Sequence, residues 1–397
     1  MKRNQKVIVS GLVFLLLSGN PIANSYERPA VRPIPDEILS SRYNLTVERI
    51  RTNSGEAEKL AFIKSGLVLG ISRTKGLVSK YYLNDDKVLK LQNLGQVLLP
   101  STLTGLEILR IENSKFYKNY LYTAITTKPD ADKCNYLVLV RQKYTSTGSL
   151  EPASRVFQSD CDRSKNDTWG GGITFNASQL YLSVGENRIS YKTALPFTDS
   201  YTSFQLEKKN TYFGKVISIN LNNFKEIKIM SIGHRNPAAL FYDLKSSTLF
   251  ESEFGPEGGD EINVIKRGKD YGYPQSSFGR IYDEKNPGIK SKFTIKYENY
   301  SKYEIPLMAY VPSVNPLQLF IISSTSEFKD WRGNLFVGCL SGKILRIVLN
   351  DKEFSGSVIL SEELEFGARI RDFTEISSSH LLAATDDGEI VLLGIQN

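Results

Sequence analysis

Histidine is nearly absent from this 397-residue chain, which contains only His234 and His380. The chain also lacks GxSxG, HExxH and GxxxxGK[ST] motifs and an EF-hand loop. Zinc hydrolases, serine hydrolases with a usual catalytic triad and P-loop enzymes are therefore excluded, because each class needs residues that the sequence does not supply.

Cysteine is also scarce: there are three, with no CxxC pair and no Cys/His cluster. A structural zinc site is therefore not expected. Cys134 and Cys161 flank polar, turn-like stretches, whereas Cys339 lies inside an apolar run. Because oxidising compartments favour bridges between exposed loops, we predict a Cys134–Cys161 disulfide and a buried free thiol at Cys339. Three unpaired thiols are the alternative.

The hydrophobic run at the N-terminus is short. Lys2, Arg3 and Lys6 precede eleven apolar residues, 7–17, and small residues follow at 23–25. As a helix, eleven residues rise only ~16 Å, whereas a bilayer core is ~30 Å thick. The pattern is typical of a secretory signal peptide rather than a transmembrane anchor.

These features predict a signal peptide over 1–25, an N-terminal extension over 26–59 and a mature domain over 60–397. The mature protein is expected to be secreted or periplasmic. No cysteine follows the apolar run, so we expect no lipid anchor and no stable membrane anchor. The 50 Lys+Arg residues barely outnumber the 43 Asp+Glu residues and form no long cluster. A nucleic-acid partner is therefore not expected.

The mature sequence consists of short β-rich runs bounded by Gly, Asn and Asp turns, and no long stretch has a helical apolar period. An all-β fold follows. Hairpin units at 333–349 and 379–393 are typical of successive outer strands in four-stranded blades. We predict a six-bladed β-propeller of four-stranded antiparallel blades, because radial repetition protects strand edges. Seven shorter blades or two sandwiches are the alternatives.

Three motifs follow one another in the second half of the chain: GHRNPAAL at 233–240, ESEFGPEGGDEINVI at 251–265 and GKDYGYP at 268–274. In this order and spacing the sequence resembles the glucose/sorbosone dehydrogenase family, the soluble pyrroloquinoline quinone (PQQ)-dependent aldose dehydrogenases. PSVNP at 312–316 and ARIRDF at 368–373 continue the resemblance. It covers roughly residues 60–396 and implies the same six-bladed propeller.

The resemblance implies PQQ and Ca²⁺ as cofactors and a sugar as substrate. The residues that match the family's positions for the quinone carboxylates are Arg235, Asn236, Arg369 and Arg371. Planar guanidinium groups suit carboxylates, although Arg235 and Arg371 could instead clamp backbone carbonyls between blades. Gly255 and Pro256 match the positions whose carbonyls bind calcium, and Asp260, Glu261 and Asn263 are expected to brace that loop.

The departures from the family pattern concern its catalytic groups. The family's basic histidine aligns with Thr168, and a following arginine aligns with Gly172. Phe254 stands where the family has His or Gln, and it could stack on a flat ring but not donate a hydrogen bond. Asp167 is the candidate substitute for the missing base, and His234 is a weaker one.

Two functional hypotheses remain. The first is an exported sugar dehydrogenase-like propeller related to quinone-dependent aldose oxidation. The second is a catalytically lapsed propeller that binds a sugar, a cell-wall fragment or a protein partner. The fold cannot decide between them, because propellers support many functions.

Overall fold

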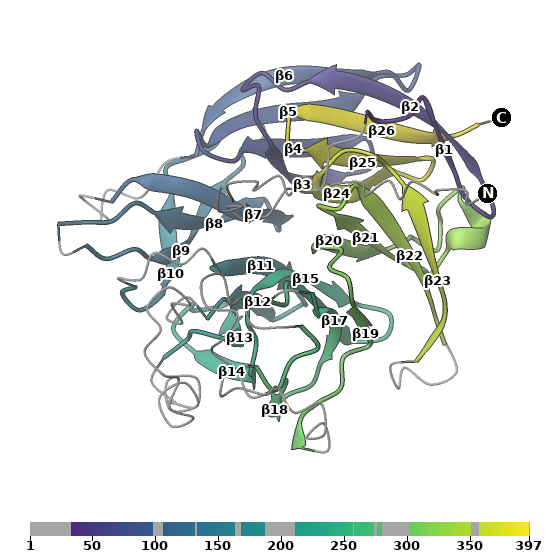
Figure 1. Cartoon of the computed structure of the whole chain (residues 1–397). Helices are drawn as coiled ribbons and strands as arrows, with labels where there is room; N and C mark the ends of the chain where they lie inside the picture. The colour runs from purple at the N-terminus through teal and green to yellow at the C-terminus, as the bar shows by residue number, and fades with distance from the viewer. Residues whose placement is uncertain are drawn as a thin grey trace, which may run out of the picture. The chain divides into compact units, whose positions relative to one another are not determined.

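Six inner strands contact one another in a closed ring (Figure 1). In ring order they are β3 (Glu58–Lys64), β7 (Ile108–Tyr117), β11 (Gly170–Phe175), β15 (Pro237–Asp243), β20 (Pro316–Ile321) and β24 (Ile370–Ser377). In the first five sheets the inner strand is also the first strand in chain order, whereas the sixth sheet includes β1 and β2, which precede its inner strand β24 in the chain. The prediction of an all-β, six-bladed β-propeller is confirmed.

The computed structural model describes residues 33–97, 106–131, 133–162, 168–186, 211–256, 258–273, 276–279, 302–350 and 357–396. They belong to a unit that runs from Val31 to Asn397. The predicted signal peptide over 1–25 lies outside the described residues. Within them, no helix has the length and apolar character needed to span a bilayer.

The first three sheets follow in chain order. Sheet 1 continues from β3 through β4 (Leu67–Ser72), β5 (Leu77–Leu83) and β6 (Leu89–Gln96). Sheet 2 continues from β7 through β8 (Tyr120–Thr127), β9 (Leu137–Lys143) and β10 (Ser154–Gln158). Sheet 3 continues from β11 through β12 (Gln179–Val184), β13 (Lys215–Asn220) and β14 (Ile227–Ile232), and then adds β18 (Lys269–Asp270) in parallel.

The last three sheets complete the ring. Sheet 4 continues from β15 through β16 (Thr248–Glu253), β17 (Asp260–Ile265) and β19 (Met308–Tyr310). Sheet 5 continues from β20 through β21 (Leu335–Cys339), β22 (Lys343–Leu349) and β23 (Val358–Glu365). Sheet 6 continues from β24 through β25 (His380–Thr385) and β26 (Glu389–Ile395) to β2 (Asn44–Arg51) and β1 (Glu37–Leu39).

Two details differ from the sequence prediction. Sheets 3 and 6 have five strands rather than four. The hairpins at 333–349 and 379–393 supply middle strands, β21 with β22 and β25 with β26, rather than outer ones. Middle strands are covered on both faces by the neighbouring sheets, which explains why these runs are almost continuously apolar.

The N-terminal extension predicted over 26–59 contributes to the propeller. Strand β2 pairs antiparallel with β26 from Leu45 opposite Ile395 to Arg51 opposite Glu389. The two ends of the described chain thus meet in one sheet, and the propeller includes strands that precede residue 60. This pairing protects the edge of β26 and joins the first blade to the last.

Apolar side chains fill each of the six interfaces between neighbouring sheets. The interface between sheets 5 and 6 is rich in aromatic rings, with Phe320 5.1 Å from Phe373 between ring centroids. Because strand side chains alternate in direction, every sheet supplies apolar residues to both neighbours. The core is therefore a ring of six apolar layers. Buried polar side chains such as Lys59, Asn113 and Asp372 lie on the inner strands.

The predicted Cys134–Cys161 disulfide is present, with the two Cα atoms 5.1 Å apart. It connects the segment before β9 to the segment after β10, at the outer edge of sheet 2. Cys339 is a buried free thiol in β21, as expected.

A buried carboxylate in sheet 1 should make stability depend on pH. Glu58 is 1% exposed and accepts a hydrogen bond from the Tyr81 hydroxyl at 2.7 Å. Burial raises its pKa from 4.5 to about 7. Because the folded protein holds this proton more tightly, the stabilisation is complete below pH 4.5 and is lost as the pH rises to about 7.

We expect the free energy of unfolding to fall by about 3 kcal/mol over this interval because of Glu58. Denaturant titrations of Glu58→Gln should lack this component, whereas Glu48→Gln, on the exposed face of β2, should retain it. Equal pH slopes for wild type and Glu58→Gln would contradict the assignment.

Candidate functional site

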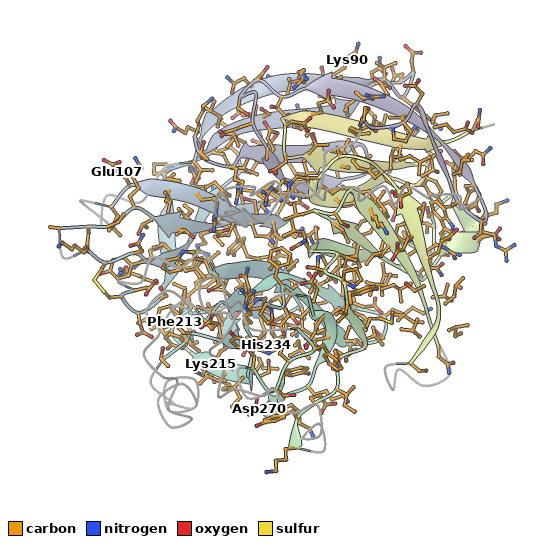
Figure 2. All side chains as sticks on the ribbon, viewed as in Figure 1. Lys90, Glu107, Phe213, Lys215, His234 and Asp270 are labelled. Carbon is orange, nitrogen blue, oxygen red and sulfur yellow. A yellow bond between two sulfur atoms is a disulfide. The ribbon has the colours of Figure 1, made fainter. Side chains whose placement is uncertain are left out.

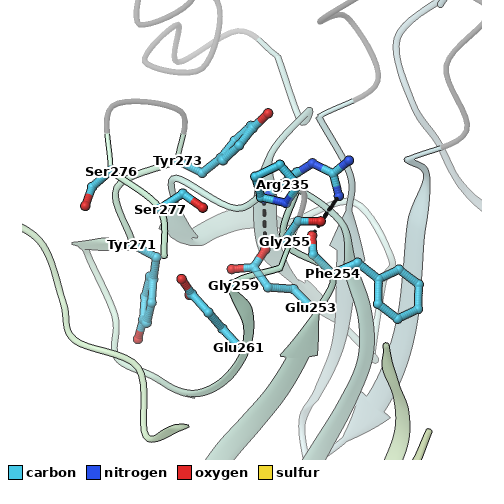
Figure 3. A pocket seen from close by; sticks show the side chains of 11 residues that line it. Arg235, Glu253, Phe254, Gly255, Gly259, Glu261, Tyr271, Tyr273, Ser276 and Ser277 are labelled. Carbon is cyan, nitrogen blue, oxygen red and sulfur yellow. Dashed lines mark hydrogen bonds between the residues drawn. The ribbon is translucent and has the colours of Figure 1, made fainter. Parts of the chain in front are cut away.

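Arg235 holds together the two loops that carry the main motifs. It lies between β14 and β15, and its side chain reaches the loop after β16 (Figure 3). The guanidinium Nη1 donates to the carbonyl oxygens of Phe254 at 2.8 Å and Gly255 at 2.6 Å. Its backbone N–H donates to the Glu253 carboxylate at 2.8 Å. Arg235 therefore has the carbonyl-clamping arrangement that was the alternative to a quinone contact.

Asp260 braces the loop after β16, which contains Gly255, as expected. One carboxylate oxygen accepts the N–H of Gly255 at 2.9 Å, and the other accepts the N–H groups of Val314 at 2.8 Å and Asn315 at 2.7 Å. A Cβ at Gly255 would lie 2.3 Å from the carbonyl oxygens of Gly258 and Gly259, so only glycine fits there. The Gly255 carbonyl is thus held in one orientation.

Asn236 connects this region to the segment that contains Thr168. Its side-chain oxygen accepts the N–H of Gly170 at 3.0 Å. Thr168 is half-buried, and its carbonyl oxygen would be 1.6 Å from a Cβ at Gly185, so this turn is tightly packed. The structure therefore brings Thr168 close to the Arg235 loop. Asp167, the candidate substitute base, lies outside the described residues.

Arg369 and Arg371 lie on the same side of the chain, because alternate side chains of an extended segment point the same way. Both guanidinium groups bind Asp386: Arg369 at 2.8 Å, and Arg371 through Nε and through Nη2 at 3.1 Å. Burial would raise the pKa of Asp386, but hydrogen bonds and charge from the two arginines hold it at about 2. The two cations are therefore already paired with an internal anion.

Apolar contacts connect the two arginine groups. Phe254 packs against Ala238, Leu317 and Leu340. The Leu340 carbonyl oxygen in turn accepts a hydrogen bond from Arg369 at 3.4 Å. The predicted site residues thus lie along neighbouring loops, although Phe254 packs on aliphatic side chains.

Basic residues that the sequence analysis did not identify surround Arg371. The Lys59 ammonium donates to the Arg371 carbonyl oxygen at 3.1 Å, and Lys59 is 6% exposed. Burial, and to a lesser extent the charge of nearby Arg371, lower the pKa of Lys59 to about 8 and that of Arg73 to about 10. Arg110 is paired with Glu112 at 2.7 Å. Alternating charges on the inner strands were the available signal for this cluster.

Each of the two histidines contacts a serine hydroxyl, and the two lie in different parts of the propeller. His234 is 0% exposed, lies within 2.8 Å of the Ser231 hydroxyl through Nε2, and stacks on the Tyr271 ring. His380 begins β25 and lies within 2.8 Å of the Ser379 hydroxyl. The His234 imidazole is thus closed off from solvent, and His380 belongs to sheet 6.

PQQ with calcium does not fit the site as the described residues hold it. A calcium ion bound to the Gly255 carbonyl would share this oxygen with the Arg235 guanidinium. At ~5 Å separation and an effective dielectric constant of ~20, the repulsion between the two cations is about 7 kcal/mol. Arg369 and Arg371 already have Asp386 as their anionic partner. A quinone carboxylate would have to compete with it.

The fold and these loops define an all-β propeller with an arginine-rich site at the ends of its inner strands. Residues 57–393 match the family model described as Glucose / Sorbosone dehydrogenase. Because this match covers most of the chain, the chain belongs to the glucose/sorbosone dehydrogenase family.

Individual relatives are distant. The chain is 31% identical to aldose sugar dehydrogenase YliI of Escherichia coli over 261 residues, which is 61% of this chain and 64% of that protein. It is 29% identical to quinoprotein glucose dehydrogenase B of Acinetobacter calcoaceticus over 209 residues, 47% of this chain and 41% of that protein. The aligned region thus spans less than two thirds of either relative.

Solved structures show the same fold. The apo form of the soluble aldose sugar dehydrogenase from Escherichia coli has a TM-score of 0.66 at 19% identity, covering 89% of this chain and 99% of that one. The PQQ-bound aldose sugar dehydrogenase from Streptomyces coelicolor has a TM-score of 0.62 at 20% identity, covering 91% of this chain and all of that one.

Proposed function

We propose that this chain is an exported, sugar-binding propeller of its family in which PQQ-dependent aldose oxidation is strongly impaired. The observation that carries the proposal is that neither histidine is available as a base: His234 is 0% exposed, and His380 lies in another sheet than the Thr168 turn. His234 is sealed between Ser231 and Tyr271, and His380 lies in sheet 6. A threonine hydroxyl stays protonated near neutral pH and is a poor general base.

The arrangement of the cations supports the same proposal. The Arg235 guanidinium is hydrogen-bonded to the Gly255 carbonyl oxygen, and Arg369 and Arg371 form ion pairs with Asp386. The proposed ligand is a sugar or a larger saccharide, because the named relatives are sugar dehydrogenases. Export by the N-terminal signal peptide is part of the proposal.

Dye-linked oxidation of aldoses tests this function. The purified mature protein is reconstituted with PQQ and Ca²⁺ beside YliI prepared in the same way. Because a positioned general base contributes ~10²–10⁴-fold, we expect a rate at least ~10²-fold below that of YliI. A rate equal to that of YliI, abolished by Asp167→Asn but not by Asp243→Asn at the end of β15, would mean that Asp167 is a relocated base and that the proposal fails.

A further inference from the structure

Three glutamates and one asparagine face one another on β16 and β17, next to the segment that carries Arg235. Glu251 and Glu253 lie two residues apart on β16 and therefore point to the same side. Across the pair of strands, Glu251 lies opposite Asn263, and Glu253 lies opposite Glu261 on β17. Like charges directly opposite each other destabilise a sheet unless another group compensates for them.

Burial makes this arrangement costly. Glu251 is 0% exposed, Glu253 4% and Glu261 8%. The Asn263 amide nitrogen lies within hydrogen-bond distance of all three carboxylates, at 2.9 to 3.3 Å, with two N–H protons for the three acceptors. One Glu251 oxygen, Oε1, is fully buried and has no hydrogen-bond partner. Burial and the charge of Glu253 raise the pKa values of Glu251 and Glu261. Buried carboxylates are normally paired or coordinate metals.

His234 completes the cluster from the loop after β14. Its Nδ1 lies 3.6 Å from Glu253 Oε1 and has no hydrogen-bond partner. With Nε2 protonated and donating to the Ser231 hydroxyl, Nδ1 presents its lone pair to the carboxylates. The Tyr271 ring, 4.7 Å from the imidazole between centroids, fixes the plane of the ring. Figure 2 labels His234, which is 0% exposed, among the teal strands, and Figure 3 shows Glu253 and Glu261 side by side.

We propose that His234, Glu251 and Glu253 form a buried binding site for one divalent metal ion of the zinc type. Each of the three residues offers a ligand atom within 4.8 Å of the other two. Two ligands of a tetrahedral zinc ion, each at ~2.0–2.1 Å, lie ~3.4 Å apart, which is close to the observed 3.6 Å between His234 and Glu253. An imidazole nitrogen with two carboxylates suits zinc better than calcium, which prefers oxygen ligands.

The supporting contacts match those of metal sites. A metal-bound histidine usually donates its other N–H to a neighbouring acceptor, as His234 does to Ser231, and bound carboxylates are themselves hydrogen-bonded, as by Asn263. The ion would tie the residue before Arg235 to the residue before Phe254. It would thus be a structural ion that secures the Arg235 clamp. This role does not depend on whether the protein oxidises sugars.

Metal analysis of the full mature chain tests the site. After dialysis against a chelator, Zn²⁺ is returned, and its stoichiometry and affinity are measured by calorimetry and elemental analysis. We expect one Zn²⁺ per chain, a rise in the unfolding temperature on its return, and an affinity about 100-fold or more weaker in Glu251→Gln. The matched control is Glu375→Gln, which alters a partly buried carboxylate in sheet 6 and should bind Zn²⁺ as wild type does.

Cobalt substitution separates this site from surface binding, because Co²⁺ in a tetrahedral site has an intense visible spectrum that surface-bound Co²⁺ lacks. Wild type should develop the spectrum, and Glu251→Gln should not. If Glu251→Gln does not fold, the wild-type stoichiometry and unfolding temperature still decide the matter. Wild type that binds no Zn²⁺ below 100 μM, or Glu251→Gln that binds as wild type does, would overturn the proposal.

Discussion

Asp260→Ala should be the most destabilising single substitution in the candidate site. The Asp260 side chain is 0% exposed and accepts the backbone N–H groups of Gly255, Val314 and Asn315. Alanine would leave these three donors without their acceptor. Each unsatisfied buried group costs ~1–3 kcal/mol, so we expect the free energy of unfolding to fall by about 4 kcal/mol or more. Denaturant titration measures the loss.

Asp243→Ala is the matched control for Asp260. Asp243 ends β15 in the same sheet, is only partly buried, and accepts the N–H groups of Lys245 at 3.2 Å and Ser246 at 3.0 Å. Its removal should cost less than ~1 kcal/mol, because water can replace the carboxylate. Similar losses for the two variants would show that Asp260 does not brace the loop.

We expect PQQ to bind far more weakly than with a nanomolar dissociation constant. Hydrogen bonds to charged groups contribute ~1.5–3 kcal/mol each, so losing two or three of them weakens binding by ~10²–10⁶-fold. In this chain Arg369 and Arg371 bind Asp386, and Phe254 replaces a polar residue of the family pattern. Titration calorimetry with PQQ and Ca²⁺ should detect weak binding or none.

Asp386→Asn provides the comparison for the quinone titration. This substitution removes the anion that competes for Arg369 and Arg371. PQQ should therefore bind Asp386→Asn at least ~10-fold more tightly than wild type. Nanomolar affinity of wild type would contradict the account and would indicate that Phe254 stacking compensates.

The sequence predicted the fold class because all six blades repeat the same short apolar runs and turns. It did not predict the order of strands within a blade, since β21 and β25 are as apolar as an inner strand would be. Strand β2 was missed because its exposed face reads as polar, NLTVERIR, and its partner β26 lies more than 330 residues away. Long-range pairing of this kind leaves no local signal.

The candidate site was predictable where a motif places residues on one loop. Gly255 and Asp260 lie in one motif, and their hydrogen bond follows from that motif. The direction of the Arg235 guanidinium was not predictable, because either a cofactor carboxylate or a backbone carbonyl can accept its protons. Lys59 and Arg73 were missed because both come from sheet 1, Lys59 on β3 and Arg73 just after β4, whereas Arg371 lies on β24 of sheet 6. The His234 cluster was missed because its ligands have no conventional spacing.

A crystal structure of the protein grown with PQQ and Ca²⁺ would test the central claim most directly. The account predicts that Arg235 remains on the carbonyl oxygens of Phe254 and Gly255, that Arg369 and Arg371 remain on Asp386, and that no ion lies on Gly255. Calcium bound to the carbonyls of Gly255 and Pro256, with Arg235 turned to a quinone carboxylate, would contradict it.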